Sequence, residues 1–262
     1  MALVLFFGGN GHASARLDAA RAAVERLAAA GDIGRFDILE VPYPGFEGRP
    51  RAAGADAFLQ ALAGFTAAAC AREDVVVHAT GIGALFAVTL RARQELGRAP
   101  IVMQGPVLWG LEHRWMPRLA RLGLAPVIPR LFQRAAFQRH FLRRHFALPP
   151  PASVAAAFFH GYARCTATAD LFRWCGPRWL RQVEAAVHEG RVDLGRVQVW
   201  WGGRDRVVGP GELRWTETAL GVRWHERTFP EWGHYPMIED PEGWARAVAA
   251  TVPAEPPGII AG

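Results

Sequence analysis

A chain of 262 residues, of which 51% are hydrophobic, is long enough to bury a full core and is expected to form one domain of α/β size. Its three cysteines form no CxxC pair, so the pattern predicts reduced thiols and excludes a disulfide framework or a zinc knuckle. All 30 basic residues are arginines, which makes the net charge of +6 weak evidence for an acidic partner. No nucleic-acid-binding module accompanies that charge, so we expect no nucleic-acid partner.

The start of the chain, MALVLFFGG, carries no basic leader. Its apolar stretch of about six residues is too short for a signal sequence or a membrane span. We therefore expect a cytoplasmic protein without a transmembrane segment.

Apolar runs bounded by Gly, Pro and Asp predict six strands. They cover residues 2–7, 35–41, 74–79, 99–104, 197–201 and 222–229. Helix-period stretches lie between most of them, at 14–30, 52–71, 83–97, 210–220 and 239–251. Strands that are continuously apolar and alternate with helices indicate a mostly parallel sheet covered on both faces, which is a doubly wound α/β fold.

The interval from 108 to 190 contains no convincing strand, only helical patterns interrupted by prolines. We predict a helical cap there, above the edge of the sheet where such folds bind ligands. The Pro149–Pro151 triplet is expected to separate two cap helices. The predicted domains are then a first core part (1–107), the cap (108–190) and a second core part (191–262).

An acid and a histidine follow the last two strands. Asp205 comes just after the strand in VQVWWGGRDRVV, and His234 lies in the loop of FPEWGHYPMIEDP. Both residues are delivered at the same edge of a parallel sheet, where the carboxylate could hold one ring N–H and leave the other nitrogen as a base. Taken singly, Asp205 could equally cap the next helix and His234 could be solvated.

With these residues the chain resembles the α/β-hydrolase superfamily over almost its whole length, most clearly at 2–14, 74–91 and 197–250. The resemblance implies an α/β-hydrolase fold with a helical cap, a WGxxDxxV segment carrying the acid and a GH segment carrying the histidine. The hairpin that usually precedes the first core strand is missing, as in the compact branch that includes hydroxynitrile lyases and small plant-type esterases.

The resemblance also implies an oxyanion hole in FFGGNGHAS, after the first strand. Gly8 and Gly9 take the places where a main-chain N–H faces the substrate, and Asn10 adds a polar group at the same rim. Glycine suits this place because a residue without Cβ lets the backbone approach an oxygen closely. A plain strand-to-helix turn would give the same letters.

The superfamily's nucleophile turn reads small-x-nucleophile-x-small, and VVVHATGIGALFAV supplies Ala79 and Gly83 as the small residues. This register puts Gly81 at the nucleophile position and makes the Ile82 N–H the second oxyanion donor. The register centred on Thr80 would crowd His78 and Ile82 against backbone, so Thr80 is the less favoured nucleophile. The only serines, Ser14 and Ser153, lie in no such turn.

These residues predict an enzyme without a serine nucleophile, in which His234 and Asp205 act as a general base toward an apolar carbonyl compound. Lyase, cyclase or isomerase chemistry and direct water attack all suit this arrangement, and acyl transfer does not. A ligand-binding pseudo-hydrolase and an esterase or thioesterase that uses Thr80 are the alternatives. We expect no metal and no cofactor.

Residues 111–146 of the cap contain eight arginines and a single acid, Glu112, with aromatic residues between them. Three roles compete for this segment: a solvated helix face, a docking surface for an acidic carrier protein that would bring a tethered substrate in a biosynthetic pathway, and a contact with a membrane surface. Aromatic residues such as Phe158, Tyr162 and Trp179 predict a small apolar or aromatic substrate.

Overall fold

The computed structural model describes residues 1–9, 14–108, 111, 114–164, 167–174, 177–192, 194 and 196–252. Six parallel strands form one sheet in the order β2-β1-β3-β4-β5-β6. The strands are β1 (Ala2–Phe7), β2 (Phe36–Glu40), β3 (Val75–Thr80), β4 (Ile101–Gln104), β5 (Val197–Gly202) and β6 (His225–Phe229). Each strand falls within the apolar run that predicts it or overlaps that run by all but one residue. The six-stranded α/β architecture is therefore confirmed.

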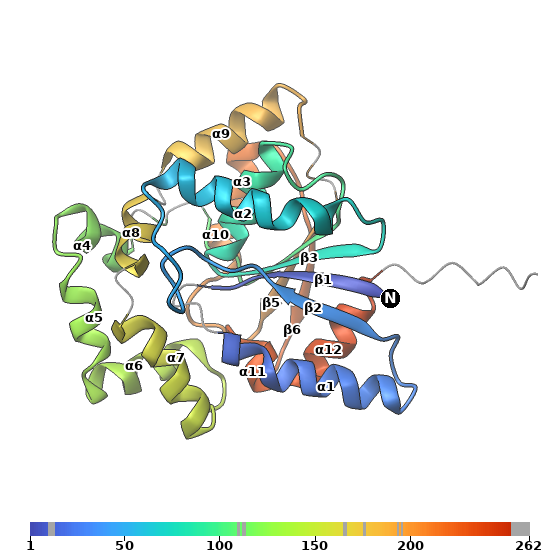
Figure 1. Ribbon diagram of the computed structural model, residues 1–262, viewed down its shortest axis with the longest axis horizontal. Coiled ribbons are helices and arrows are strands. Elements are labelled where there is room, and N and C mark those ends of the chain that lie inside the picture. The colour runs from blue at the N-terminus through green and yellow to red at the C-terminus, as the bar shows by residue number, and fades with distance from the viewer. Residues whose placement is uncertain are drawn as a thin grey trace, which may run out of the picture.

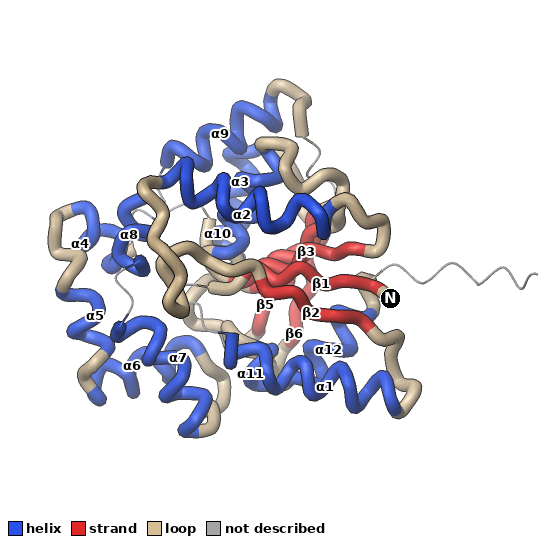
Figure 2. Tube along the Cα trace, viewed as in Figure 1, coloured by secondary structure: helices blue, strands red, loops and turns tan. Residues whose placement is uncertain are grey.

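The helices cover both faces of this sheet (Figures 1 and 2). One face is covered by α2 (Ala55–Cys70), α3 (Gly83–Ala92), α9 (Pro177–His188) and α10 (Pro210–Leu220). The other face is covered by α1 (Asp18–Ala29), which follows the short 3-10 helix η1 (Ser14–Leu17), and by α11 (Pro236–Glu239) and α12 (Pro241–Ala249). Because both faces are covered, β1, β3 and β4 are buried along their whole length.

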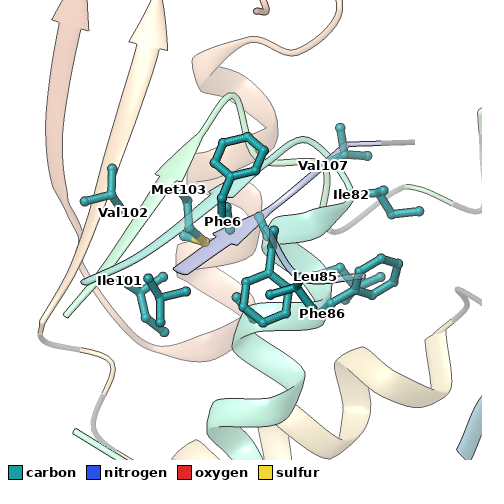
Figure 3. Packing of buried hydrophobic residues seen from close by; sticks show 14 of the residues in the cluster. Phe6, Ile82, Leu85, Phe86, Ile101, Val102, Met103 and Val107 are labelled. Atoms are coloured by element: carbon teal, nitrogen blue, oxygen red, sulfur yellow. The ribbon is translucent and has the colours of Figure 1, made fainter. Parts of the chain in front are cut away.

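Helix α3 lies at the centre of the core. All of its residues are buried, and Figure 3 shows Leu85 and Phe86 in the same cluster of buried side chains as Ile101 and Met103 of β4. Fully burying a side chain of this size contributes about 1.5–3 kcal/mol relative to leaving it exposed. The start of α3 is therefore a rigid support for the turn that precedes it.

The predicted cap interval contains helices and no strand among its described residues. These helices are α4 (Trp115–Arg121), α5 (Val127–Phe132), α6 (Ala135–His145), α7 (Ala152–Arg164) and α8 (Ala167–Trp174), followed by α9. Pro149–Pro151 lies between α6 and α7, as predicted. Helix α9 packs against α3 and α10 of the core.

Within the described ranges, no helix combines the length and the apolar character that crossing a bilayer requires.

Candidate active site

The carboxyl ends of all six strands lie at one edge of the sheet, next to the cap (Figure 1). The loops that leave β1, β3, β4, β5 and β6 there therefore converge, although they are far apart in the sequence. These loops carry Asp205 and His234, the predicted acid and general base, and they carry both glycine-containing turns.

Asp205 and His234 form a buried hydrogen-bonded pair. The distance between Asp205 Oδ2 and His234 Nδ1 is 2.7 Å, and the side chains are only 0% and 3% exposed. The other carboxylate oxygen of Asp205 accepts hydrogen bonds from the N–H groups of Val207 (2.7 Å) and Val208 (3.2 Å). Asp205 thus fixes the imidazole so that Nε2 is the nitrogen left for chemistry.

Gly81 lies directly beneath that free nitrogen. Its φ is +57°, and a Cβ placed on it would lie 3.3 Å from His234 Nε2. The Gly81 N–H donates to the Gln104 carbonyl (3.1 Å), and the Gly81 carbonyl accepts from the Val107 N–H (2.9 Å). These two hydrogen bonds hold the turn in a left-handed conformation. In this conformation the Cβ position of Gly81 is directed toward His234.

Steric contacts support the register centred on Gly81. A Cβ on Gly83 would lie 2.5 Å from the Phe7 carbonyl oxygen and 2.6 Å from that of Gly8, distances that real Cβ atoms do not reach. Ala79, at the other flank, has no exposed surface. Positions 79 and 83 therefore have no room for large side chains, as the sequence predicts.

Two backbone N–H groups lie near Gly81. The N–H of Ile82, at the start of α3, donates to no other residue in the described ranges, and the same holds for Gly9 after β1. The Gly9 Cα lies 3.9 Å from the position of a Gly81 Cβ. The Gly8 carbonyl accepts a hydrogen bond from Tyr43 Oη (2.7 Å), which holds the loop in place. Asn10, predicted at the same rim, lies outside the described residues.

Thr80 is placed differently. It ends β3, its side chain is 1% exposed, and its Oγ1 has no hydrogen-bond partner among the described residues. It borders a cavity of about 10 Å³ together with Gly9 and Tyr235, a space about large enough for one water molecule. In this place the Thr80 hydroxyl makes no hydrogen bond with His234.

Gly105, after β4, is a site residue that sequence reasoning missed. Its φ is +49°, and a Cβ on it would lie 2.9 Å from both Asp205 Oδ2 and His234 Nδ1. Only glycine therefore leaves room for the 2.7 Å bond of the pair. The signal was available in the sequence, because APIVMQG places a glycine directly after a predicted strand.

His145, the last residue of α6, was also missed. Its ring centroid lies 5.7 Å from that of His234, and its carbonyl accepts the His234 N–H (2.9 Å). Its Nδ1 lies 2.8 Å from the Phe141 carbonyl oxygen, which can only accept, so Nδ1 carries the proton and Nε2 has the lone pair. Burial, together with the nearby His234, lowers the pKa of His145 well below its ordinary value.

Glu239, at the end of α11, joins the histidine loop to the cap. Its Oε2 accepts from the N–H groups of Ala147 (2.7 Å) and Gly233 (3.2 Å), and its Oε1 accepts from that of Tyr235 (3.1 Å). Burial raises the pKa of Glu239, while these N–H groups oppose that effect. No motif in the sequence singles this residue out.

A cavity of about 520 Å³ lies between the cap and the core beside this pair. It does not contain Asp205, His234 or Gly81, but His145 and Val207 line it and each contacts one member of the pair. Most of its lining is apolar or aromatic. The members of that kind are Trp115, Met116, Pro117, Phe137, Phe141, Phe172, Val207 and Trp215.

The described part of the chain contains no cluster of His, Cys, Asp and Glu that could hold a metal ion, and Cys70 is a free thiol. Among the described residues, the polar groups at this place are a buried imidazole, its carboxylate and nearby backbone N–H groups.

A family model described as the alpha/beta hydrolase family matches residues 4–247. No curated protein sequence matches the chain significantly.

Solved structures match at low sequence identity. A candidate aryl esterase from Burkholderia cenocepacia is 15% identical, covers 95% of this chain and 89% of its own, and superposes with a TM-score of 0.67. A haloalkane dehalogenase from Bradyrhizobium elkani is 16% identical over the same shares, with a TM-score of 0.65. The 2-hydroxy-6-oxo-6-phenylhexa-2,4-dienoate hydrolase from Rhodococcus sp. strain RHA1 is also 16% identical over those shares, with a TM-score of 0.64. These similarities establish a common fold.

Proposed function

Because the chain belongs to the alpha/beta hydrolase family, we propose that it is an enzyme of this fold that works without a serine nucleophile. In this proposal His234 is the general base, Asp205 orients it, and the N–H groups of Gly9 and Ile82 stabilise an oxyanion. The observation that carries it is the 3.3 Å between His234 Nε2 and the point where a Gly81 side chain would begin.

The absence of a side chain at Gly81 leaves space for a reacting group below Nε2. In direct hydrolysis a water molecule occupies this space, its oxygen attacks the substrate carbonyl carbon and its proton passes to Nε2. The carbonyl oxygen becomes an oxyanion held by the two N–H donors. When the intermediate collapses, the leaving group takes the proton back from Nε2, and His234 is restored.

The same base could instead remove a proton from the substrate. This step would begin a lyase, cyclase or isomerase reaction, with the oxyanion of an enolate or alkoxide on the same donors. The geometry of the base is common to these reactions, and they remain predictions beside direct water attack.

The proposed substrate is a small apolar or aromatic carbonyl compound. The 520 Å³ cavity has the size of a small-molecule site, and its lining is largely aromatic. Two of the similar structures carry names that fit this class, an aryl esterase and a hydrolase of a phenyl-substituted dienoate. His145 links the cavity to His234 and offers a neutral Nε2 as a hydrogen-bond acceptor for a substrate O–H or N–H.

Two alternatives use the same pocket. A non-catalytic binding protein would retain the cavity and can also keep the buried pair, so the pair distinguishes it only weakly from an enzyme. An esterase or thioesterase based on Thr80 would require that side chain to turn from its buried place toward His234. The direction of the Gly81 position favours the base mechanism over the Thr80 esterase.

An acidic carrier protein is the proposed macromolecular partner, at the arginine-rich cap. Arg114 is neutralised by a bidentate ion pair with Glu212, but the other arginines between residues 118 and 144 are exposed. Their charge supports a salt-sensitive contact with an acidic surface.

Restoring the missing hydroxyl tests the mechanism. In Gly81→Ser the new Oγ would come within hydrogen-bond distance of Nε2. We therefore expect the variant to hydrolyse p-nitrophenyl esters at least about tenfold faster than the parent protein. The serine should also react with a fluorophosphonate, and peptide mapping should place the label at position 81.

Two matched variants complete this experiment. Gly81→Ala carries the same positive-φ strain without a hydroxyl and should gain no esterase activity, and Gly81→Ser/His234→Ala should lose the gain. If Gly81→Ser folds, as judged by circular dichroism, and neither hydrolyses esters nor takes up the label, the assignment of Gly81 and His234 is wrong. Labelling of Thr80 in the parent protein would favour the Thr80 esterase.

A further inference from the structure

Helix α6 separates two cavities. Residues 137, 140, 141, 144 and 145 of this helix line the 520 Å³ cavity already described. Arg139, Leu142, Arg143 and Phe146 follow the spacing i, i+3, i+4, i+7 and line a second cavity of about 430 Å³. The two cavities share no lining residue, so the second is a separate site on the other side of the helix.

The second cavity is strongly basic. It is lined by Arg139 and Arg143 from α6 and by Arg204 and Arg206 from the loop after β5, with no carboxylate in the lining. Arg204 forms an ion pair with Glu231. The other three form no ion pair with any residue in the described ranges. Arg139, Arg143 and Arg206 thus present exposed guanidinium groups to one space, where a bound anion can pair with them.

The remaining lining of this cavity is apolar. Leu142 packs against the core, Phe146 is 6% exposed, and Ala147 and Pro149 complete the surface. A plain inorganic anion would leave this surface uncovered. The arrangement fits a ligand that combines a negatively charged group with an apolar portion.

We propose that the 430 Å³ cavity binds a small amphipathic anion. Its charged group pairs with Arg139, Arg143 and Arg206, and its apolar portion lies on Leu142, Phe146 and Pro149. The site is distinct from the proposed reaction centre, but Arg204 and Arg206 flank Asp205 in the sequence and Ala147 donates to Glu239. A ligand bound there therefore contacts the loop that carries Asp205, and it contacts Ala147, whose N–H is bonded to the Glu239 carboxylate next to the histidine loop.

Isothermal titration of the full chain at low salt tests this proposal, with octyl phosphate as the probe. We expect one molecule to bind per chain, at least about tenfold more tightly than inorganic phosphate, and octanol not to bind detectably. The double variant Arg139→Gln/Arg143→Gln should weaken octyl phosphate binding by about tenfold or more. Arg206→Gln should weaken it as well, and because this change lies on the other wall it covers the case in which the double variant fails to fold.

Two control variants test whether binding depends on the arginines of this cavity rather than on the charge of the cap as a whole. Arg130→Gln/Arg134→Gln removes two exposed cap arginines that do not line the cavity and should leave binding unchanged. Trp215→Ala truncates an exposed side chain of α10 that lines only the other cavity and should also leave it unchanged. The proposal is overturned by no binding, by equal weakening in both double variants, or by loss only in Trp215→Ala. Binding to phosphatidylglycerol vesicles without binding of monomeric octyl phosphate would overturn it too.

Discussion

Three glycines with different contacts decide the geometry of the site at the scale of single residues. The Cβ position of Gly81 is directed at His234 Nε2, Gly83 lets the backbone of β1 approach, and Gly105 makes room for the bond between Asp205 and His234. At Gly83 and Gly105 the geometry depends on the absence of a Cβ. The first two were predicted from the turn pattern, because their spacing lies within one short segment. The third glycine directly follows a predicted strand, but its contact with the pair depends on β4 lying beside β5 in the sheet.

We predict that Gly105→Ala disrupts the pair. The added Cβ would lie 2.9 Å from Asp205 Oδ2 and from His234 Nδ1, so one of the two side chains must move and the 2.7 Å bond must lengthen. The downfield proton NMR signal expected for a histidine N–H bonded to a carboxylate should be lost or shifted. Unfolding in urea should show a destabilisation of about 2 kcal/mol or more, beyond the strain of the positive φ.

Gly123→Ala is the matched control, because Gly123 has a φ of +77° and no atom within 4 Å of its Cβ position. It should cost about 1 kcal/mol for the backbone strain alone and leave the histidine signal unchanged. Equal effects of the two substitutions would mean that the contact with the pair is unimportant.

At the scale of secondary-structure elements, β1, β3 and β4 were predictable because each fills a buried layer with a continuous apolar run, whereas β2 is partly exposed and β6 largely exposed. Element ends were less predictable. The stretch 83–97 has helical periodicity throughout, but α3 ends at Ala92, and Gln94 then takes a φ of +63°, which no helix accommodates. The sixth strand begins at His225 rather than at residue 222, and the Trp224 N–H donates to the Glu217 carboxylate instead.

The roles of His145 and Glu239 could not be predicted for a different reason. His145 ends a cap helix and Glu239 ends a short helix of the core, and nothing in the periodicity of either segment describes how the two meet. Their contacts with the histidine loop arise from the docking of the cap onto the core. Residues whose function depends on such docking carry no local signal in a single sequence.

Glu239 is predicted to be a positioning residue for the histidine loop. In Glu239→Gln one carboxylate oxygen becomes an NH₂ group, which cannot accept a hydrogen bond. In the place of Oε2 it loses the bonds from the N–H groups of Ala147 and Gly233, and in the place of Oε1 it loses the bond from that of Tyr235. We expect a loss of about 1–3 kcal/mol in the free energy of unfolding. Hydrogen exchange should become faster at residues 145–148 and 233–235.

Glu242→Gln provides the comparison for this change. Glu242 is an exposed residue of α12 whose carboxylate pairs with Arg26 at 3.0 Å. Its substitution should change stability by no more than about 1 kcal/mol and leave exchange at the histidine loop unaltered. If Glu239→Gln behaves like this control, the three N–H bonds do not hold the loop.

At the scale of the whole molecule, stability should depend on pH through a few buried titratable groups. Burial, aided by Glu47, raises the pKa of Glu40 from 4.5 to about 7 against the opposing effect of Arg21 and Arg16. Burial alone lowers the pKa of His78 from 6.5 to about 3. The stability contributed by neutral His78 is present above pH 6.5 and is lost as the pH falls toward 3. The stability contributed by neutral Glu40 has the opposite pH dependence.

Glu40→Gln isolates that contribution. Because the folded state binds the Glu40 proton more tightly than the unfolded chain, its stabilisation is fully present below pH 4.5 and is lost as the pH rises through about 7. The loss amounts to at most about 3 kcal/mol. Glutamine stays neutral, so the free energy of unfolding of the variant in urea, relative to that of the parent protein, should rise between about pH 5 and pH 8. His78 affects both proteins equally. Glu25→Gln, an exposed change on α1, should show a difference that does not vary with pH, and a similarly constant difference for Glu40→Gln would refute a raised pKa.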